Sequence, residues 1–193
     1  MADYRTIKGL QIKQFSSDPS NLVEGDIWYN STSQVLKTAP LIAAWASATN
    51  LPTATSGLRG NGTQTAGLVS AGRVAGSPIA ETYEYDGTNW TGGGNMNTAR
   101  GIGSGGGTLT AGSYAGGYDG SNVASSELYN GTNWSIGPSI NTARRGGQSA
   151  GTQTALVLME GLNSTGYPSS KNVEEYDGSS WTSVTSATNN RYA

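Results

Sequence analysis

Tyr129-Asn-Gly-Thr-Asn-Trp134 is one of three nearly identical hexapeptides in this chain. The other two are Tyr85-Asp-Gly-Thr-Asn-Trp90 and Tyr176-Asp-Gly-Ser-Ser-Trp181, which place the tryptophans 44 and 47 residues apart. Self-similarity at a period of about 40–50 residues is typical of arrays in which each repeat packs on its neighbours. The hexapeptide therefore predicts that most of the 193-residue chain consists of three equivalent units.

Two further motifs keep the same period. Asn-Thr-Ala-Arg follows the first two tryptophans, and Gly-Thr-x-Thr-Ala occurs at 62–66, 107–111 and 151–155. An arginine stands ten residues after each tryptophan, as Arg100, Arg144 and Arg191. We expect these arginines to be structural, bridging neighbouring units or binding the carbonyl groups of turns. The first unit differs, because Thr55 stands where the other units have arginine.

Each unit is expected to form four short β-strands joined by turns. Small residues fill the first strand at 100–106, which suits a crowded centre. Asn130-Gly131 predicts a type I′ hairpin turn, whose two central residues both need a positive φ. The other expected strands are 111–117, 125–129 and 134–137 in the second unit, and 144–150, 155–161, 172–176 and 181–184 in the third. No useful length of sequence has helical apolar spacing, so we expect an all-β fold of antiparallel sheets.

The composition limits both chemistry and partners. The chain has no histidine and no cysteine, which removes the commonest general base, thiolate chemistry and disulfide bonds. With 11 basic and 13 acidic residues, no basic excess is present to bind nucleic acid. The longest apolar run, at about 41–46, is far shorter than the roughly 20 residues that span a bilayer. We therefore expect no cofactor, no nucleic-acid partner and no membrane insertion.

The units also share a glycine that ends the second expected strand, a tyrosine 12–15 residues later and a tryptophan five residues beyond it. The glycines are Gly72, Gly117 and Gly161. This pattern resembles the kelch repeat over about 46–193, which implies four-stranded β-propeller blades at about 55–92, 100–137 and 144–185. It departs from the kelch repeat because only Gly116-Gly117 is a double glycine and the tyrosine–tryptophan gap is one residue shorter.

The two ends of the chain differ from these units. Residues 1–24 are expected to form an attachment arm, and residues 25–48 a hairpin that resembles half a blade, with Trp45 standing 45 residues before Trp90. Residues 190–193 resemble the opening of a further first strand. Three units and two partial ones are too few for a closed propeller of four to eight blades. Either the chain continues in a longer protein, or several copies share one closed structure as a homo-oligomer.

The N-terminal stretch Glu24-Gly-Asp-Ile-Trp-Tyr-Asn30 is similar to a phrase near the starts of bacteriophage tail-fibre and related virion proteins. The resemblance implies a non-enzymatic virion structural protein, with residues 1–24 bound to other virion proteins. Its function would be that of a tail fibre or adhesin, exposed on the particle and attached to a glycan of the bacterial surface. Two alternatives stay open: a capsid or tail decoration protein without receptor binding, and a glycan-degrading propeller enzyme, which would need two or three acids in one pocket.

Aromatic side chains are the candidate binding residues, because their faces suit sugar rings. Those that recur with the repeat are expected to pack between blades: Trp45, Trp90, Trp134, Trp181, Tyr85, Tyr129 and Tyr176. Tyr114, Tyr118 and Tyr167 stand outside the repeat register, in or beside strand ends and loops, where binding residues are commonly carried on a rigid scaffold. We expect these three tyrosines to contact a ligand, and we expect no catalytic residue and no metal site.

Overall fold

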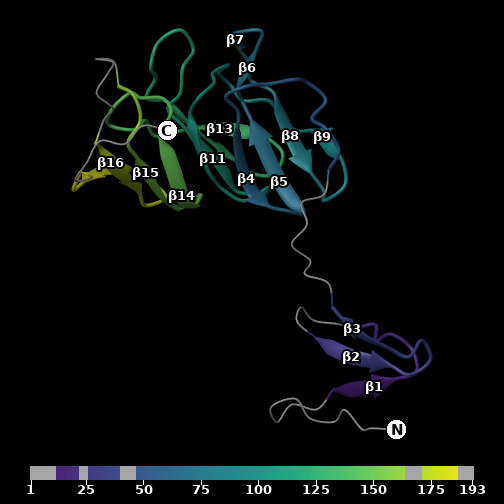
Figure 1. The fold of residues 1–193 in the computed structure, drawn as a ribbon. Helices are drawn as coiled ribbons and strands as arrows, with labels where there is room; N and C mark the ends of the chain where they lie inside the picture. Colours follow the sequence, from purple (N-terminus) through teal and green to yellow (C-terminus); the bar gives the residue numbers. More distant parts are fainter. Residues whose placement is uncertain (1–11, 22–25, 40–46, 164–170, 187–193) are drawn as a thin grey trace. The chain divides into compact units, whose positions relative to one another are not determined.

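The structure, a computed structural model, describes residues 12–21, 26–39, 47–163 and 171–186. Within these ranges it contains 17 β-strands and no helix. The chain divides into two compact units, Met1–Ser47 and Ala48–Ala193, both drawn in Figure 1. The prediction of an all-β fold is confirmed for the described part of the chain.

The N-terminal unit contains a three-stranded sheet in the order β1–β2–β3. Strand β1 (Lys13–Phe15) pairs in parallel with β2 (Ile27–Asn30), and β2 pairs antiparallel with β3 (Val35–Thr38). This pairing corrects the expected division into an arm at 1–24 and a half blade at 25–48. A strand of the supposed arm belongs to the same sheet as the hairpin, and a parallel pair has no place in an antiparallel blade. Trp45 lies outside the described residues.

One carboxylate ties this small sheet to the segment that follows β1. Asp18 Oδ1 accepts hydrogen bonds from Trp28 Nε1 at 3.2 Å and from Asn30 Nδ2 at 2.7 Å. Lys37 Nζ lies 2.6 Å from Asp18 Oδ2. These contacts, led by the hydrogen bond from Lys37, lower the pKa of Asp18 to about 2. The carboxylate therefore stays charged at neutral pH and holds strands β2 and β3 together.

The second unit contains three four-stranded antiparallel sheets, which follow one another along the chain. The first sheet consists of β4 (Arg59–Thr63), β5 (Ala66–Ser70), β8 (Thr82–Tyr85) and β9 (Trp90–Gly92). The second consists of β10 (Ser104–Gly107), β11 (Gly112–Ala115), β12 (Ser126–Tyr129) and β13 (Trp134–Gly137). The third consists of β14 (Gln148–Thr152), β15 (Ala155–Met159), β16 (Val173–Tyr176) and β17 (Trp181–Val184). A small hairpin of β6 (Arg73–Val74) and β7 (Ser77–Pro78) connects β5 to β8.

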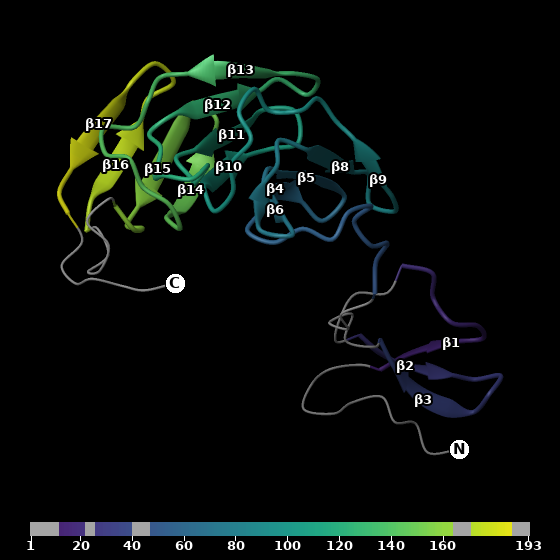
Figure 2. The same ribbon diagram turned by 90° about the horizontal axis from the view of Figure 1, so that it is seen from above.

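Seen from above, the three sheets stand side by side in an arc (Figure 2). The first strands β4, β10 and β14 lie on the inside of the arc, and the fourth strands β9, β13 and β17 lie on the outside. Neighbouring first strands approach closely: Ser149 Oγ donates to Gly105 O at 2.6 Å, and Ser104 Oγ donates to Gly147 O at 2.8 Å. This close approach explains why small residues fill these strands.

The first strands begin later than the sequence predicts. Strand β10 begins at Ser104 and β14 at Gln148, four residues after the expected starts at 100 and 144. The backbone has a positive φ of 58° at Ile102 and of 68° at Gly146, which interrupts the extended conformation. Ile102 N donates to Gly57 O at 2.8 Å, and Gly146 N donates to Ile102 O at 2.7 Å. The interruptions therefore form hydrogen bonds that run from sheet to sheet.

The hairpin between the third and fourth strands is not the expected type I′ turn. Tyr129 pairs with Trp134, so the loop contains residues 130–133. Gly131 has a φ of 91°, whereas Asn130 is not in the left-handed region. Asn130 Oδ1 instead accepts hydrogen bonds from the backbone amides of Thr132 at 3.0 Å and Asn133 at 2.8 Å. The Asn-Gly pair marks the hairpin correctly, but side-chain capping determines its shape.

Two apolar cores fill the spaces between neighbouring sheets. The first contains Leu68, Ala71, Met96, Tyr114, Tyr129 and Trp134. The second contains Ala115, Ile140, Leu156, Leu158, Tyr176 and Trp181. Each core joins residues of one sheet to the tyrosine and tryptophan of the next sheet's hexapeptide. Side-by-side stacking is therefore what buries the apolar residues of the array.

Gly103 gives a direct test of this crowding. A Cβ at this position would lie 2.2 Å from the ring of Tyr114, a rigid and fully buried side chain. We expect Gly103→Ala to lower the free energy of unfolding by about 1–3 kcal/mol through overpacking. The matched control is Gly92→Ala, because a Cβ there meets no atom within 4 Å. Urea unfolding followed by tryptophan fluorescence measures both, and equal stabilities of the two variants would contradict the packing.

Candidate functional site

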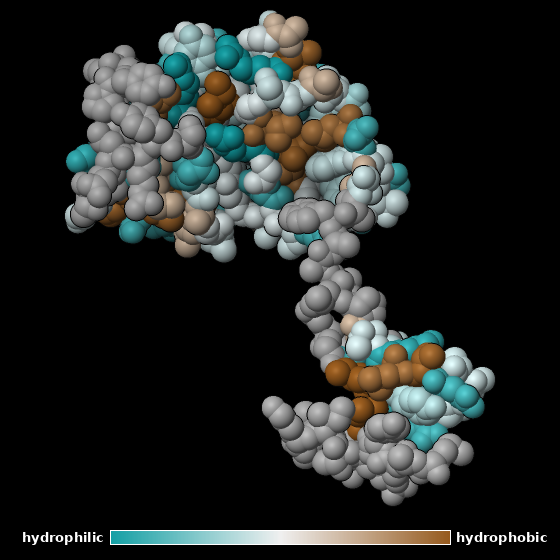
Figure 3. Space-filling model, in the orientation of Figure 1, coloured by the Kyte–Doolittle hydropathy of each residue, from teal (hydrophilic) through white to brown (hydrophobic). Residues whose placement is uncertain are grey.

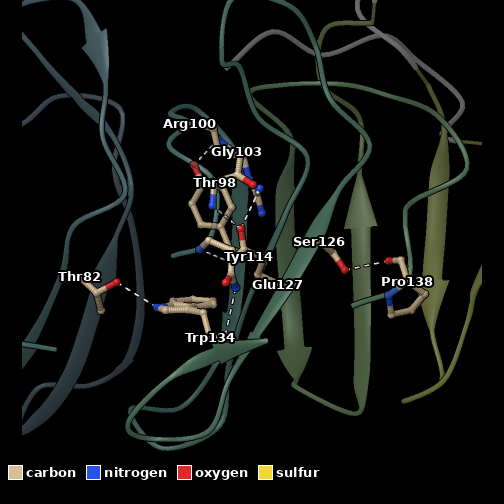
Figure 4. A network of polar contacts seen from close by, with 10 residues as sticks. Thr82, Thr98, Arg100, Gly103, Tyr114, Ser126, Glu127, Trp134 and Pro138 are labelled. Atoms are coloured by element: carbon tan, nitrogen blue, oxygen red, sulfur yellow. Dashed lines mark hydrogen bonds and ion pairs between the residues drawn. The ribbon is translucent and has the colours of Figure 1, made fainter. Parts of the chain in front are cut away.

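A buried ion pair joins the connection between the first and second sheets to strand β12 (Figure 4). Arg100 Nη1 lies 3.0 Å from Glu127 Oε1, and both side chains are almost completely buried. Glu127 Oε2 accepts hydrogen bonds from Asn97 N at 2.7 Å and Asn97 Nδ2 at 2.9 Å, and Oε1 accepts one from Thr98 N at 3.2 Å. The Asn-Thr-Ala-Arg motif therefore encloses one carboxylate of the following sheet, an arrangement that we call the carboxylate clamp.

The third sheet contains a second carboxylate clamp. Arg144 Nη2 donates to Glu174 Oε1, and the backbone amides of Asn141 and Thr142 donate to the same carboxylate at 2.6 and 3.2 Å. Arg144 Nη1 also donates to Asn172 O at 2.8 Å. Burial lowers the pKa of Arg144, and the charge of Glu174 opposes this shift. Both charges are therefore buried, and no substrate could reach them.

The same arginines also hold the preceding sheet. Gly72 N, just after β5, donates to Arg100 O at 3.0 Å. Gly117 N, just after β11, donates to Arg144 O at 2.9 Å. Each arginine binds one sheet through its backbone and the next through its side chain. The structure therefore places Arg100 and Arg144 between neighbouring sheets, while Arg191 lies outside the described residues.

The first sheet replaces the clamp with uncharged residues. Tyr83 stands on β8 at the position of Glu127 and Glu174, and its hydroxyl donates to Glu81 Oε2 at 2.8 Å and lies 3.0 Å from Thr53 Oγ1. Sequence reasoning recognised Thr55 in place of arginine but missed the glutamate partners. The signal was present, because the unit that lacks the arginine is also the unit that lacks the glutamate.

In the second and third sheets, the recurring tyrosine and tryptophan pack against the preceding sheet. The rings of Tyr129 and Trp134 lie with centroids 5.0 Å apart, and Trp134 Nε1 donates to Thr82 Oγ1 of the first sheet at 3.0 Å (Figure 4). The Tyr129 hydroxyl donates to Glu84 Oε1 of the first sheet. Burial, reinforced by Glu84, raises the pKa of Tyr129 to about 12. The other two pairs, Tyr85–Trp90 and Tyr176–Trp181, have ring centroids 4.8 and 5.1 Å apart.

Tyr114 is not a ligand-binding residue, which corrects the expectation from the sequence. It is fully buried on β11, and its hydroxyl accepts a hydrogen bond from Gly103 N at 2.8 Å. The Arg100 guanidinium lies 5.3 Å from the ring centroid. A residue next to a strand end is thus part of the core, because the neighbouring sheet covers that face of β11. Tyr167 lies outside the described residues.

Tyr118, by contrast, is partly exposed and lies between two arginines. The Arg145 guanidinium carbon lies 4.5 Å and the Arg73 guanidinium carbon 5.2 Å from the centroid of the Tyr118 ring. Arg73 belongs to β6, in the connection between β5 and β8 of the first sheet, Tyr118 lies in the connection between β11 and β12 of the second, and Arg145 precedes the first strand of the third. We call these three residues the arginine–tyrosine cluster. The tyrosine predicted from the sequence is therefore present at an accessible position, with two arginines that the sequence analysis did not connect to it.

Equivalent backbone bridges bring the cluster together. Arg73 pairs with Ser56, Tyr118 with Gly101 and Leu162 with Arg145 in isolated antiparallel bridges. Each bridge follows the second strand of its sheet. The bridge residues Arg73, Tyr118 and Leu162, which differ from sheet to sheet, therefore lie at the same end of their sheets. Arginine, tyrosine and leucine thus occupy one repeat position, which marks a surface where the sheets differ from one another.

The cluster has unused hydrogen-bond donors. Arg145 Nη1 donates to Asn122 Oδ1 at 3.1 Å, and Asn122 Nδ2 donates to Leu162 O at 2.9 Å. Arg73 Nε is buried without a hydrogen-bond partner, and neither arginine forms an ion pair with any described acid. Because guanidinium groups already lie over the Tyr118 ring, a ligand would meet their N–H groups rather than an open aromatic face.

The described residues contain no group of three or more acidic side chains placed to hold a metal ion. None of their segments forms a helix long and apolar enough to cross a membrane.

The repeated four-stranded sheets define the class of the chain: an all-β protein of stacked antiparallel sheets. No protein-family model matches it, and no curated protein sequence matches it. Among solved structures, "Structure of YjhT" is similar to it with a TM-score of 0.55 and 15% sequence identity, covering 82% of this chain and 51% of the YjhT chain. This likeness shows a shared fold, and the chain spans about half the length of that structure.

Proposed function

We propose that this chain is a non-enzymatic phage virion protein, a tail fibre or adhesin, whose kelch-like propeller blades bind an acidic glycan of the bacterial surface. The observation that carries the binding function is the arginine–tyrosine cluster. Loops on a rigid scaffold commonly carry binding residues, and three stacked sheets provide such a scaffold. Two arginines that form no ion pair with any described acid favour a ligand that supplies the negative charge.

The sheet arrangement supports the propeller part of the proposal. Each sheet has four antiparallel strands, with the first strand on the inside of the arc and the fourth on the outside (Figure 2). The kelch-like glycine, tyrosine and tryptophan occur in all three sheets at equivalent places. Neighbouring blades of a propeller pack face to face in this way around a central axis.

The N-terminal unit supports attachment to other virion proteins. Four of the five large apolar side chains that are exposed in the described residues belong to its three strands, and Figure 3 shows apolar surface on this unit. They are Phe15, Ile27, Val35 and Leu36. Exposed apolar surface on so small a sheet is typical of an interaction site. The attachment surface of this proposal is the sheet β1–β3 as a whole rather than residues 1–24 alone.

The ligand is expected to be an acidic polysaccharide. Guanidinium groups donate paired N–H groups to carboxylates, sulfates and phosphates, and hydrogen bonds to charged groups are stronger than those to neutral groups. Arg73 and Arg145 reach the Tyr118 ring from two different connecting segments, so two charged groups along one polysaccharide chain could be bound together. A neutral polysaccharide would leave both guanidiniums without counter-charge.

Binding to immobilised polysaccharides tests the function. We expect the full chain to bind alginate, a polyuronate, and not neutral dextran. Arg145→Gln and Arg73→Gln should each weaken alginate binding at least about tenfold, the equivalent of one charge-assisted hydrogen bond. Lys13→Gln removes the same charge from the N-terminal unit and should leave binding unchanged. Equal binding of dextran, no binding to alginate, or equal effects of the lysine and arginine variants would contradict the proposal.

A further inference from the structure

We infer that a second copy of this chain packs head to tail on the sheet array, with its first sheet against the outer face of the third sheet of its neighbour. The inference rests on repeat positions whose partners are present inside the array and are not found among the described residues at its two ends. It does not depend on glycan binding.

The first sheet exposes the side chains that face a preceding sheet elsewhere. In the second and third sheets, the hexapeptide tyrosine and tryptophan are buried against the sheet before them, at exposed fractions of 8% or less. Tyr85 and Trp90 occupy the same positions in the first sheet and are only partly buried. The difference is physical: no sheet among the described residues covers this face.

The third sheet exposes the complementary face. Leu68 of β5 and Ser113 of β11 point toward the following sheet and are buried, whereas Val157 at the same position of β15 is partly exposed. Ala115 of β11 is buried, and its counterpart Met159 is partly exposed. Within the array these two faces are complementary, and among the described residues no sheet covers either of them at the ends. The segment before β4 contacts the first face at one edge, where Trp90 Nε1 donates to Thr49 O at 3.0 Å.

One hydrogen-bonded pair inside the array has its two equivalent residues on the opposite ends of the array. Tyr129 of the second sheet donates to Glu84 of the first. Glu175 stands on β16 at the position of Glu84, and it is exposed. Tyr85 stands at the position of Tyr129, and its hydroxyl has no hydrogen bond with any described residue. Head-to-tail packing would bring Tyr85 of one copy to Glu175 of the other and form the same hydrogen bond.

A glutamine supplies an independent sign of the same junction. Gln153 Nε2, in the Gly-Thr-Gln-Thr-Ala turn of the third sheet, donates to Gly112 O and to Tyr129 O of the second sheet, both at 2.7 Å. Gln64 occupies the same place in the first sheet and is exposed. The corresponding carbonyl groups of the third sheet are those of Leu156 and Tyr176, which pair with each other as Gly112 pairs with Tyr129. Gln64 of a second copy would find both acceptors in the same geometry.

The fold comparison indicates how such packing would close. The matched 82% of this chain covers 51% of the YjhT chain, so that chain is about twice as long as the part matched here. A head-to-tail contact forms a ring when its rotation closes and an open filament when it does not. The three sheets form an arc in Figure 2, and this curvature favours a closed ring over a straight filament.

Crosslinking is a clean test, because the chain has no cysteine of its own. Chains with Tyr85→Cys are mixed with chains with Glu175→Cys and treated with a short bismaleimide crosslinker. We expect a covalent dimer of one chain of each kind. Glu84→Cys with Tyr129→Cys in a single chain is the positive control, since those residues already touch. Ile136→Cys in place of Glu175→Cys is the negative control, because Ile136 is 79% exposed and outside the proposed junction.

Sedimentation of the unmodified full-length chain supplies the second readout. We expect a dimer, and we expect Glu175→Lys to weaken it at least about tenfold through loss of the hydrogen bond from Tyr85. A monomer at all concentrations, or a covalent dimer that forms equally well through Ile136→Cys, would overturn the inference. A mass that grows with concentration would show an open filament and overturn the closed two-copy form.

Discussion

An Arg144→Met variant is expected to lose about 3–5 kcal/mol of unfolding free energy, since removal of one partner leaves the other charge buried and uncompensated. Glu174 would keep its hydrogen bonds from the amides of Asn141 and Thr142, but it would lose the only cation that it contacts among the described residues. Urea unfolding followed by tryptophan fluorescence measures the loss.

The chain itself provides the matched control for this variant. The first sheet carries Thr55 and Tyr83 where the third carries Arg144 and Glu174. A double variant, Arg144→Thr with Glu174→Tyr, copies that uncharged pair and removes both buried charges together. We expect it to be clearly more stable than Arg144→Met. A double variant as unstable as the single one would show that the clamp stabilises the array by something other than compensation of charge.

A Trp134→Ala variant is expected to lose a similar amount, about 3–5 kcal/mol, because it leaves a cavity between two sheets. Trp134 is 6% exposed, lies tilted against the Tyr129 ring and donates its Nε1–H group to Thr82. Its removal would also leave the Thr82 hydroxyl of the first sheet without this hydrogen bond. The two effects act at the same junction and should reduce both the midpoint and the cooperativity of thermal unfolding.

Trp90→Ala removes the same side chain from the same repeat position and serves as the comparison. Trp90 is only partly buried, because among the described residues it contacts the segment before β4, where its Nε1 donates to Thr49 O at 3.0 Å, and no preceding sheet. The loss of unfolding free energy in Trp90→Ala should be clearly smaller at concentrations where the chain is monomeric. The loss should be larger at concentrations where a second copy covers the first sheet. Equal losses for Trp90→Ala and Trp134→Ala in the monomer would contradict the face-to-face stacking of the sheets.

Much of the array could be predicted from the sequence because its pattern is local and repeated. The third and fourth strands of the second and third sheets begin and end within about one residue of the expected positions, since a tyrosine, an Asx-Gly turn and a tryptophan define them. The first strands were predicted less well. Ile102 and Gly146, which precede these strands, have a positive φ. Hydrogen bonds to neighbouring segments hold this conformation, and no local propensity indicates it.

The candidate site shows a similar division. Tyr118 was recognised from its place outside the repeat, but Tyr114 has the same kind of place and is buried. The difference arises because side chains alternate along a strand, and only the position of the next sheet decides which face is covered. Arg73 and Arg145 are 72 residues apart in sequence, so their meeting over one tyrosine depends on stacking of three sheets.

The sequence by itself determined the period of this protein, its strand content and the recurring tyrosine–tryptophan pairs, because hydrophobic spacing and turn residues act over a few positions along the chain. The tertiary structure alone decided which glutamate each arginine meets, which tyrosine stays accessible and which sheet faces lack a partner. Those features depend on the approach of one sheet to another, and the free energy of that approach comes from contacts between residues that lie far apart in sequence.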